Sequence, residues 1–452
     1  MRTRHVLLAV VVCASVVPAG EYRVNVRTTA SQANPALALG DAGDVLAVWS
    51  SYYGSSGRSN EICARCWGLS DVRPASAEFQ VNVAREGNHS EPAVACDGRG
   101  NFVVVWQGPG PEAEDIFVRR FDPNGAALTG EMLVHSYTPG RQLYPRVAAA
   151  DAGAFVVVWE SRGPADESQR SVVCARCFDP NAARGEAFVV DQDAYDCRYP
   201  DIAMDAAGGF AVAWMQDRTR KTVFARVFDP NGRAAAAAFE VSRVGCSSLT
   251  RPSVAMNGAG RFVVTWDGDP NRAGDDDVHA RLYDPDGTPR TDQFRVNTLT
   301  DGAQQWPRAA VNDANGLVIV WVHDANESGR ATDIHARRFD WDGVPAGGPF
   351  LLHTLAAGKQ QYPAAALADD GTLVALWETE DPNGGGYDIR ACTVPAPTDP
   401  DFDGDGRVTF FDFAALARHW RQPAQGPPAD LTGDGTIDTD DLMALCRRWL
   451  RQ

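Results

Sequence analysis

A mainly β fold, built from seven copies of a four-stranded unit, is predicted by three features of the sequence. An apolar run that ends in tryptophan recurs along the chain, and its first and last copies, Trp49 and Trp377, are 328 residues apart over six intervals. The period is about 55 residues, which suits four short strands and their turns. Each unit has four runs rich in Val, Phe and Ile, bounded by turn residues and without a helical period. The recurring tryptophans are Trp49, Trp106, Trp159, Trp214, Trp266, Trp321 and Trp377.

The four strands of one unit can be followed in order. The first begins Pro-x-x-Ala, as at Pro92, and an Asp-Gly or Asn-Gly turn leads to the second, which ends in the tryptophan. The third carries Asp-Ile-x-Ala-Arg-x-Phe, as at 333–339, and is followed by Asp-Pro-Asn-Gly or a variant of it. In that turn proline sets φ and glycine accepts a positive φ, as a hairpin requires. The fourth strand has the pattern Glu-Phe-x-Val-Asn, as at 78–82.

The two ends of the repeat region predict that the units close into a ring. The seventh unit stops after its third strand, at 388–394, and the missing fourth strand occurs at 21–25. A closed ring needs this offset, whereas an open solenoid would leave two exposed sheet edges. We therefore predict a seven-bladed β-propeller over residues 21–394, in which Tyr22 and Val24 pair with 388–394. The repeats also resemble Phe-Val-Val-Val-Trp and Ala-Arg-Phe-Asp repeats of secreted bacterial surface proteins, which implies the fold rather than an activity.

The N-terminal residues predict export. Residues 2–5 carry positive charge, and the apolar stretch 6–17 is too short to span a bilayer. Small residues place a cleavage site after Ala19 or Gly20, so residues 1–20 are predicted to be a signal peptide. No later segment is apolar enough to span a membrane. We expect a secreted, extracellular bacterial protein, with association to a cell surface as a further option.

Composition argues against one class of partner. The 452-residue chain has 59 acidic and 42 basic residues and a formal charge of −17. A nucleic acid needs clustered Lys and Arg to meet its phosphates. We therefore expect no nucleic-acid partner.

Nine cysteines follow the predicted signal peptide, so at least one has no partner within the chain. Two Cys-Ala-Arg-Cys motifs, at 63–66 and 174–177, have the spacing of redox or zinc sites. Both fall on the third strand of a unit, where residues three apart point to opposite faces. We interpret them as packed strand cysteines, with a few disulfides permitted by export. A metal or redox role is the alternative.

A new pattern begins after the Pro-rich segment 395–400, which we interpret as a linker to a separate module at 401–452. The loop 401–412 has Asp at positions 1, 3, 5 and 12 and Gly at position 6. This spacing wraps the backbone around a hard cation such as Ca²⁺. The predicted ligands are Asp401, Asp403, Asp405, Arg407 through its carbonyl, Thr409 through a water molecule, and Asp412.

The loop recurs at 430–441, and each copy leads into a predicted helix with matching apolar positions. Thr432 stands where a carboxylate or amide is expected at position 3, so this second calcium site is predicted to be weaker. Two acidic turns without a metal are the alternative. The ligands predicted for the second loop are Asp430, Thr432, Asp434, Thr436, Asp438 and Asp441.

This duplicated loop and helix resembles a type I dockerin, the calcium-dependent module that docks secreted proteins onto cohesin domains. The resemblance covers residues 399–452 and implies two calcium ions and a cohesin-like partner. Cellulosomal dockerins usually carry a Ser/Thr pair for cohesin at loop positions 10 and 11. Here those positions hold 410–411, both Phe, and 439–440, Thr and Asp, so the chain departs from the family at the positions that contact cohesin.

One face of the predicted ring combines acidic loops, which include Glu160, Asp267 and Glu378, with aromatic residues that precede the repeat proline. Such a surface suits a glycan, and paired carboxylates can hydrolyse glycosidic bonds. Ordinary solvated loops are the alternative. No catalytic triad, phosphate loop or dinucleotide motif is present, and His279 and His335, at one repeat position, are interpreted as packing residues. The aromatic residues of the candidate glycan surface are Tyr144, Tyr199, Trp306 and Tyr362.

Two functions follow from these features. The favoured one is a secreted, non-enzymatic binding or scaffold protein, with the propeller as ligand platform and the calcium-dependent module as attachment. The alternative is a glycoside hydrolase-type enzyme, or an accessory component, that acts in extracellular polysaccharide breakdown.

Overall fold

The computed structural model confirms a mainly β chain with seven four-stranded blades, one of which has a fifth short strand beside it, and one helix among the described residues. Residues 18–396 form one compact unit, and 397–452 belong to another. None of the described helices is long and apolar enough to cross a membrane. The structure describes residues 19–28, 31–53, 59–71, 74, 76–136, 140–163, 170–180, 182–191, 193, 195–243, 251–268, 276–314, 316–324, 331–354, 358–381, 385–396, 430–432 and 437–449.

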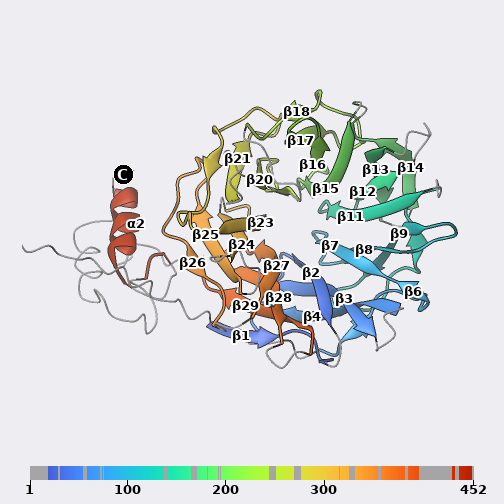
Figure 1. Cartoon of the computed structure of the whole chain (residues 1–452), viewed down its shortest axis with the longest axis horizontal. Coiled ribbons are helices and arrows are strands. Elements are labelled where there is room, and N and C mark those ends of the chain that lie inside the picture. Colours follow the sequence, from blue (N-terminus) through green and yellow to red (C-terminus); the bar gives the residue numbers. More distant parts are fainter. Residues whose placement is uncertain are drawn as a thin grey trace, which may run out of the picture. The chain divides into compact units, whose positions relative to one another are not determined.

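The sheets follow one another around a ring as seven blades (Figure 1), each with its first strand nearest the centre. The first blade consists of β2 (Gln32–Leu39), β3 (Asp44–Tyr53), β4 (Ser59–Gly68) and β5 (Phe79–Gln80), with β6 (Gly87–Asn88) beside β4, and the second of β7 (Ser90–Cys96), β8 (Phe102–Pro109), β9 (Glu114–Phe121) and β10 (Met132–Leu133). The third blade consists of β11 (Arg141–Ala149), β12 (Phe155–Arg162), β13 (Ser171–Asp179) and β14 (Ala182–Val189). The fourth consists of β15 (Asp196–Met204), β16 (Phe210–Asp217), β17 (Lys221–Phe228) and β18 (Phe239–Glu240).

The remaining three blades have the same order, and the last takes its outer strand from the start of the chain. They consist of β19 (Ser253–Met256), β20 (Phe262–Gly268), β21 (Asp277–Tyr283) and β22 (Phe294–Arg295); β23 (Ala303–Val311), β24 (Leu317–Asp324), β25 (Asp333–Phe339) and β26 (Phe350–Leu351); and β27 (Gln360–Leu367), β28 (Leu373–Glu380), β29 (Tyr387–Val394) and β1 (Ala19–Arg23).

The predicted ring closure is confirmed. Strand β1 pairs antiparallel with β29, with Tyr22 opposite Ala391. The amide of Val24 continues the ladder by donating to the carbonyl of Ile389 at 2.8 Å. The strand starts at Ala19, slightly earlier than the predicted 21–25. The seventh blade thus obtains its fourth strand from the start of the chain, as the offset of the repeats required.

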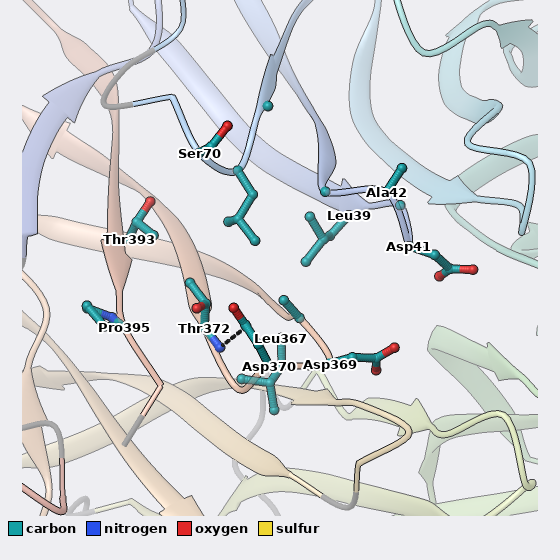
Figure 2. A pocket seen from close by; sticks show the side chains of 15 residues that line it. Leu39, Asp41, Ala42, Ser70, Leu367, Asp369, Asp370, Thr372, Thr393 and Pro395 are labelled. Carbon is teal, nitrogen blue, oxygen red and sulfur yellow. Dashed lines mark hydrogen bonds between the residues drawn. The ribbon is translucent and has the colours of Figure 1, made fainter. Parts of the chain in front are cut away.

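The junction of the seventh and first blades also holds a cavity of 660 Å³. It lies among the turns that join the first and second strands of these two blades. Figure 2 shows Leu39 and Leu367 turned towards this cavity, while the carboxylates of Asp41 and Asp369 extend away from it. Burial, and then the charges of neighbouring aspartates, raise the pKa of Asp41. This cavity combines an apolar wall with exposed acid groups and brings no catalytic pair together.

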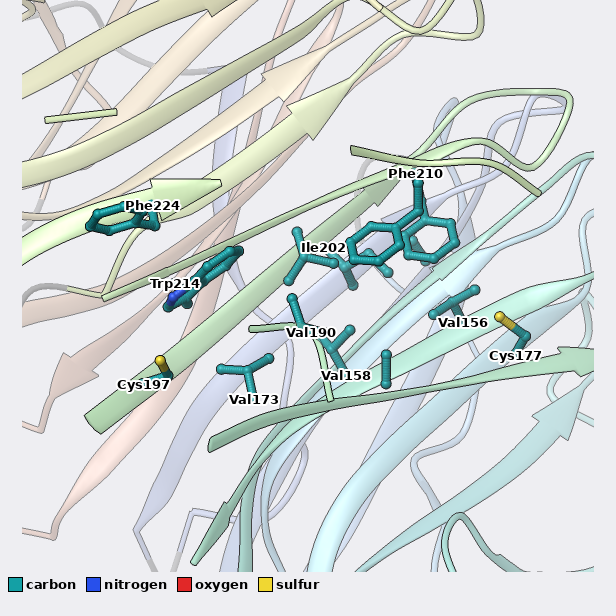
Figure 3. Close-up of a cluster of buried hydrophobic side chains, with 14 residues drawn as sticks. Val156, Val158, Val173, Cys177, Val190, Cys197, Ile202, Phe210, Trp214 and Phe224 are labelled. Carbon is teal, nitrogen blue, oxygen red and sulfur yellow. The ribbon is translucent and has the colours of Figure 1, made fainter. Parts of the chain in front are cut away.

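The core lies between adjacent blades rather than within a single sheet. Figure 3 shows one such layer, in which Trp214 and Phe210 of the fourth blade face Val156 and Val158 of the third. All seven repeat tryptophans are at most 2% exposed. In four blades the indole nitrogen donates to a glutamine on the neighbouring innermost strand. These pairs are Trp49 with Gln32, Trp159 with Gln142, Trp321 with Gln304, and Trp377 with Gln360.

The repeat arginine of the third strand joins six of the seven blades to the preceding one. Arg65 Nη1 donates to the carbonyl of Val24 at 2.8 Å, which ties the first blade to the outer strand of the last. Five more blades form the same bond, and Cys392 stands at this position in the seventh. Guanidinium donors make strong hydrogen bonds, so the Ala-Arg signature is an inter-blade link. The other five bonds are Arg119 to Val81, Arg176 to Val134, Arg226 to Val190, Arg281 to Val241 and Arg337 to Val296.

The cysteines behave as packed residues. The eight that the structure describes are all free, so the expected disulfides are absent among them. Both Cys-Ala-Arg-Cys motifs lie in third strands, β4 and β13, as predicted. Burial raises the pKa of Cys63 and of Cys174 to about 12, so these thiols stay protonated and unreactive at neutral pH.

Candidate functional site

The residue that precedes the repeat proline adopts an unusual backbone conformation at the centre of the ring. Six of these residues have φ between 50° and 55°, and their pairing registers shift at the same place. A non-glycine residue rarely takes a positive φ, and a residue before proline normally stays extended. The strain repeats from blade to blade, so the ring imposes it. The six residues are Asn34, Glu91, Tyr144, Tyr199, Trp306 and Tyr362.

The four predicted aromatic residues therefore lie in bulges of the innermost strands, not in the loops between blades where they were expected. The bulge gathers them into two pairs. The rings of Tyr144 and Tyr199 are 4.9 Å apart and meet edge to face. Those of Trp306 and Tyr362 are stacked at 4.5 Å. All four side chains are half-buried.

Arg251, which precedes the proline of the fifth blade, lies across this aromatic group. Its guanidinium lies 4.9 Å from the ring centre of Tyr144 and 5.2 Å from that of Tyr199. It also pairs with Glu91, from the second blade, at 3.3 Å. Burial lowers the pKa of Arg251, but Glu91 and the tyrosines more than offset this effect, and the pKa ends above its ordinary value.

Glu91, Arg251, Trp306 and Tyr362 line a cavity of 220 Å³ among the innermost strands. We call this space at the centre of the ring the central channel. Three guanidinium groups and only two carboxylates line it. Arg146 Nε is 4.0 Å from a carboxylate oxygen of Asp201. Arg308 donates to the carbonyl of Pro307 at 3.2 Å. Burial, and then the charge of Arg146, lower the pKa of Arg308 to about 10. The charged residues of the cavity are Glu91, Arg146, Asp201, Arg251 and Arg308.

Sequence reasoning missed these arginines, although the repeat contains a signal for them. The residue after the repeat proline is alanine in three blades, at Ala36, Ala93 and Ala364. It is Arg146 in the third blade and Arg308 in the sixth. Such a departure at an inward-facing position marks where a charge enters the channel.

Three acidic residues assigned to the loop face are instead buried in second strands. Glu160, Asp267 and Glu378 each follow the repeat tryptophan and are at most 2% exposed. Glu378 Oε1 accepts the amide of Asn34 at 2.6 Å, and Gln107, at the same repeat position, accepts the amide of Tyr144 at 3.0 Å. Burial raises the pKa of Glu378 to about 7. The shared position with Gln107 gives Glu378 a structural task, because it satisfies the strained amide of the next blade.

The second predicted calcium loop is described in part. Asp441 is fully buried, and its Oδ1 accepts the amide of Thr432 at 3.0 Å. Its Oδ2 accepts the amide of Asp438 at 2.7 Å. Thr432 Oγ1 lies 3.4 Å from Asp430 Oδ1 and 3.3 Å from Asp441 Oδ1. Loop positions 1, 3 and 12 thus present oxygen atoms to one another, which suits calcium, and α2 (Thr439–Trp449) begins within the loop.

The other predicted ligands lie outside the described residues, as do 1–18 of the predicted signal peptide and 397–400 of the predicted linker. The ligand predictions on these residues are therefore kept as predictions. They concern Asp401, Asp403, Asp405, Arg407, Thr409, Asp412, Asp434 and Thr436.

Comparison with solved structures recovers the propeller. A protein of unknown function from Dyadobacter fermentans DSM 18053 has a TM-score of 0.52 at 9% identity, over 84% of this chain and 98% of that one. A fungal alcohol oxidase of the AA5 family, in complex with copper, also has a TM-score of 0.52, at 13% identity over 87% of this chain and 78% of its own. At these identities the likeness shows the fold alone.

Sequence comparison concerns the C-terminal region. No curated protein matches the chain. Residues 399–450 match the family model described as Dockerin type I domain. The chain therefore joins a seven-bladed β-propeller to a dockerin type I domain at residues 399–450.

Proposed function

We propose that this chain is a secreted binding protein whose propeller holds an anionic saccharide in the central channel. In this proposal the C-terminal module attaches the propeller to a cohesin-like protein in a calcium-dependent manner. The chain acts outside the cell, and the predicted signal peptide 1–20 directs its export.

The excess positive charge of the channel carries the proposal. Arg146, Arg251 and Arg308 face only two carboxylates, although the chain as a whole has a charge of −17. A desolvated guanidinium is unfavourable unless an anion pairs with it. Asp201 and Glu91 offset only part of the effect of burial on the pKa of Arg308, and neither forms an ion pair with it among the described residues, so a carboxylate of the ligand supplies the missing partner. A uronic acid offers such a carboxylate.

The aromatic pairs supply the second half of saccharide recognition. Trp306 and Tyr362 line the same cavity as the arginines. Aromatic rings pack against the C–H faces of a sugar, while charged groups bind its polar substituents. The cavity volume of 220 Å³ suits one sugar ring with its carboxylate, rather than several buried rings.

Calcium is proposed to organise the C-terminal module. Asp401, Asp403, Asp405, Arg407, Thr409 and Asp412 would hold one ion. Asp430, Thr432, Asp434, Thr436, Asp438 and Asp441 would hold a second, weaker one. Each ion offsets the mutual repulsion of the aspartates and so favours the folded loop. The folded module then presents its helices to a cohesin-like partner.

The second candidate is a polysaccharide-degrading enzyme, and one observation favours it. Glu378 has a pKa of about 7, and Asn34 connects it to Glu91. The backbone amide of Asn34 donates to Glu378, and its side-chain amide donates to Glu91 Oε1 at 3.2 Å. Two carboxyl groups in different environments can act as acid and base. The structural task that Glu378 shares with Gln107 favours the binding function.

A glycan array combined with a hydrolysis assay separates the two candidates. We expect the full chain to bind uronic-acid glycans in preference to neutral ones and to release no reducing ends from them. Release of reducing ends that Glu378→Gln abolishes would establish the enzyme instead. Equal binding of neutral and acidic glycans would contradict the role of the channel arginines.

A further inference from the structure

The sixth blade contains a group of imidazoles and a carboxylate at the end where its second and third strands meet. His323 lies near the end of β24, and Asp333 and His335 lie at the start of β25. Each of the three presents one ligand atom, and these atoms all lie within 4.8 Å of one another. Within the part of the chain that the structure describes, it is the one group of this kind.

The two histidines are oriented as metal ligands require. His323 Nε2 is 3.0 Å from the carbonyl of Asp301, so Nε2–H donates there and Nδ1 keeps its lone pair. His335 Nδ1 is buried and has no hydrogen-bond partner among the described residues. A buried nitrogen without a partner is unfavourable, and a metal ion would satisfy it.

Asp333 is held in place and still open to solvent. His353 Nε2 lies 3.2 Å from Asp333 Oδ1, and 45% of the Asp333 side chain is exposed. The hydrogen bond from His353 lowers the pKa of Asp333, so the carboxylate is ionised at neutral pH. An ion can therefore reach the group from solvent and retain a water ligand on the open side.

The fifth blade has counterparts of only two of the three residues, and an arginine lies beside them. Asp277 and His279 occupy the positions of Asp333 and His335, but Gly268 stands where the sixth blade has His323. Arg295 lies 3.5 Å from Asp277, at the position that Leu351 fills in the sixth blade. The sixth blade thus gains a nitrogen ligand and lacks a competing guanidinium.

We propose that His323, Asp333 and His335 bind a divalent transition-metal ion of the Zn²⁺ type. Two imidazoles, one carboxylate and an open position form a typical zinc ligand set, whereas Ca²⁺ prefers oxygen ligands throughout. Ligand atoms around tetrahedral zinc lie about 3.3 Å apart, so small side-chain rotations close the group around the ion. His353 is a positioning residue that orients Asp333.

Titration of the full chain with Zn²⁺, in saturating Ca²⁺, tests this site, and visible absorption of bound Co²⁺ reports its coordination. We expect one equivalent to bind to the wild type. His335→Phe and His323→Ser should each weaken it at least about 100-fold, because a ligand is lost. Both changes copy residues found at the same positions in other blades, Phe117 and Ser161, so the variants should fold.

His279→Phe, in the fifth blade, is the matched control and should bind like the wild type. Circular dichroism checks that each variant is folded. If His335→Phe does not fold, the zinc affinity of His323→Ser tests the proposal. No zinc binding to the wild type, or equal binding by the wild type and a folded ligand variant, would overturn the proposal. A loss of zinc affinity in His279→Phe as large as that in His335→Phe would overturn the proposal as well.

Discussion

The third and the innermost strands of the same blades use the repeat in opposite ways. In the third strands the repeated arginine forms a bond that six of the blades share, such as the link from Arg337 to the carbonyl of Val296. In the innermost strands the repeated feature is a strained bulge, and the side chain there changes from blade to blade. Stability therefore rests on the residues that recur, while the proposed recognition of a ligand rests on those that differ. The proposed metal group of the sixth blade follows the same rule, since His323 and Leu351 are departures from the fifth blade.

Removal of 19–25 should produce the largest effect, because it breaks a recurring element completely. The last blade would lose its outer strand, the buried Val24 and the ladder bonds to Ile389. We expect the free energy of unfolding to fall by about 5 kcal/mol or more. Chemical denaturation measures it, with Val26→Ser as the control because Val26 is 58% exposed. A loss no larger than that of the control would show that the ring does not depend on β1.

Loss of one inter-blade link should have the next largest effect. Arg337→Met removes the bonds to Val296 and to the carbonyl of Gly347 and leaves both carbonyl groups without this donor. We expect a loss of about 3 kcal/mol in the free energy of unfolding. Arg233→Met is the matched control, since Arg233 is exposed. Equal stability of the two variants would contradict the role given to the repeat arginine.

Glu378→Gln is expected to raise the free energy of unfolding, by less than the two preceding changes lower it. The pKa of Glu378 is about 7 in the folded chain against an ordinary value of 4.5, so the folded state holds the extra proton between these pH values. The stability of the wild type should therefore fall as the pH rises from 4.5 to 7 and level off above it. The variant lacks this penalty and should be more stable than the wild type at pH 8 by about 2 kcal/mol.

Denaturation of both proteins at pH 5 and pH 8 measures this difference. The comparison cancels the contribution of the other carboxyl groups. A constant difference between the two proteins at both pH values would show that Glu378 does not titrate in this range.

Asp405→Ala, in the C-terminal module, is expected to leave the stability of the propeller unchanged. The variant should lose calcium affinity in its first loop without a change in the melting of the propeller. Calorimetric calcium titration and thermal melting report the two properties separately. Equal calcium affinity at both loops of the wild type would contradict the predicted weakness caused by Thr432.

The fold could be predicted from the sequence because the recurring residues take the same places in successive blades. The tryptophans, the Asp-Pro-Asn-Gly turns and the offset at the two chain ends all depend on neighbours in the repeat. The dockerin type I region could be predicted for a similar reason, because the residues of each loop are close together in the chain, while its two calcium sites stay a prediction.

The channel could be predicted only in part. The four aromatic positions were identified, but the bulge that turns them inward depends on the amide acceptors of the preceding blade, such as Glu378. The pair of Arg251 and Glu91 joins the fifth and second blades across the ring. Only the closed ring brings such residues together, so no local pattern predicted that arginines would converge there.

Calorimetric titration of the full chain with a uronic-acid oligosaccharide and with its carboxyl-reduced form tests the central claim most directly. Arg308→Ala is the matched variant, because alanine is found at this repeat position in three other blades. We expect the wild type to bind the acidic form, and to bind it about tenfold more tightly than Arg308→Ala does, since one charge-assisted contact is lost. Binding of the carboxyl-reduced form should be weak in both proteins. Equal affinities of the wild type and Arg308→Ala for the acidic form would contradict the claim that the departures from the repeat build the binding site.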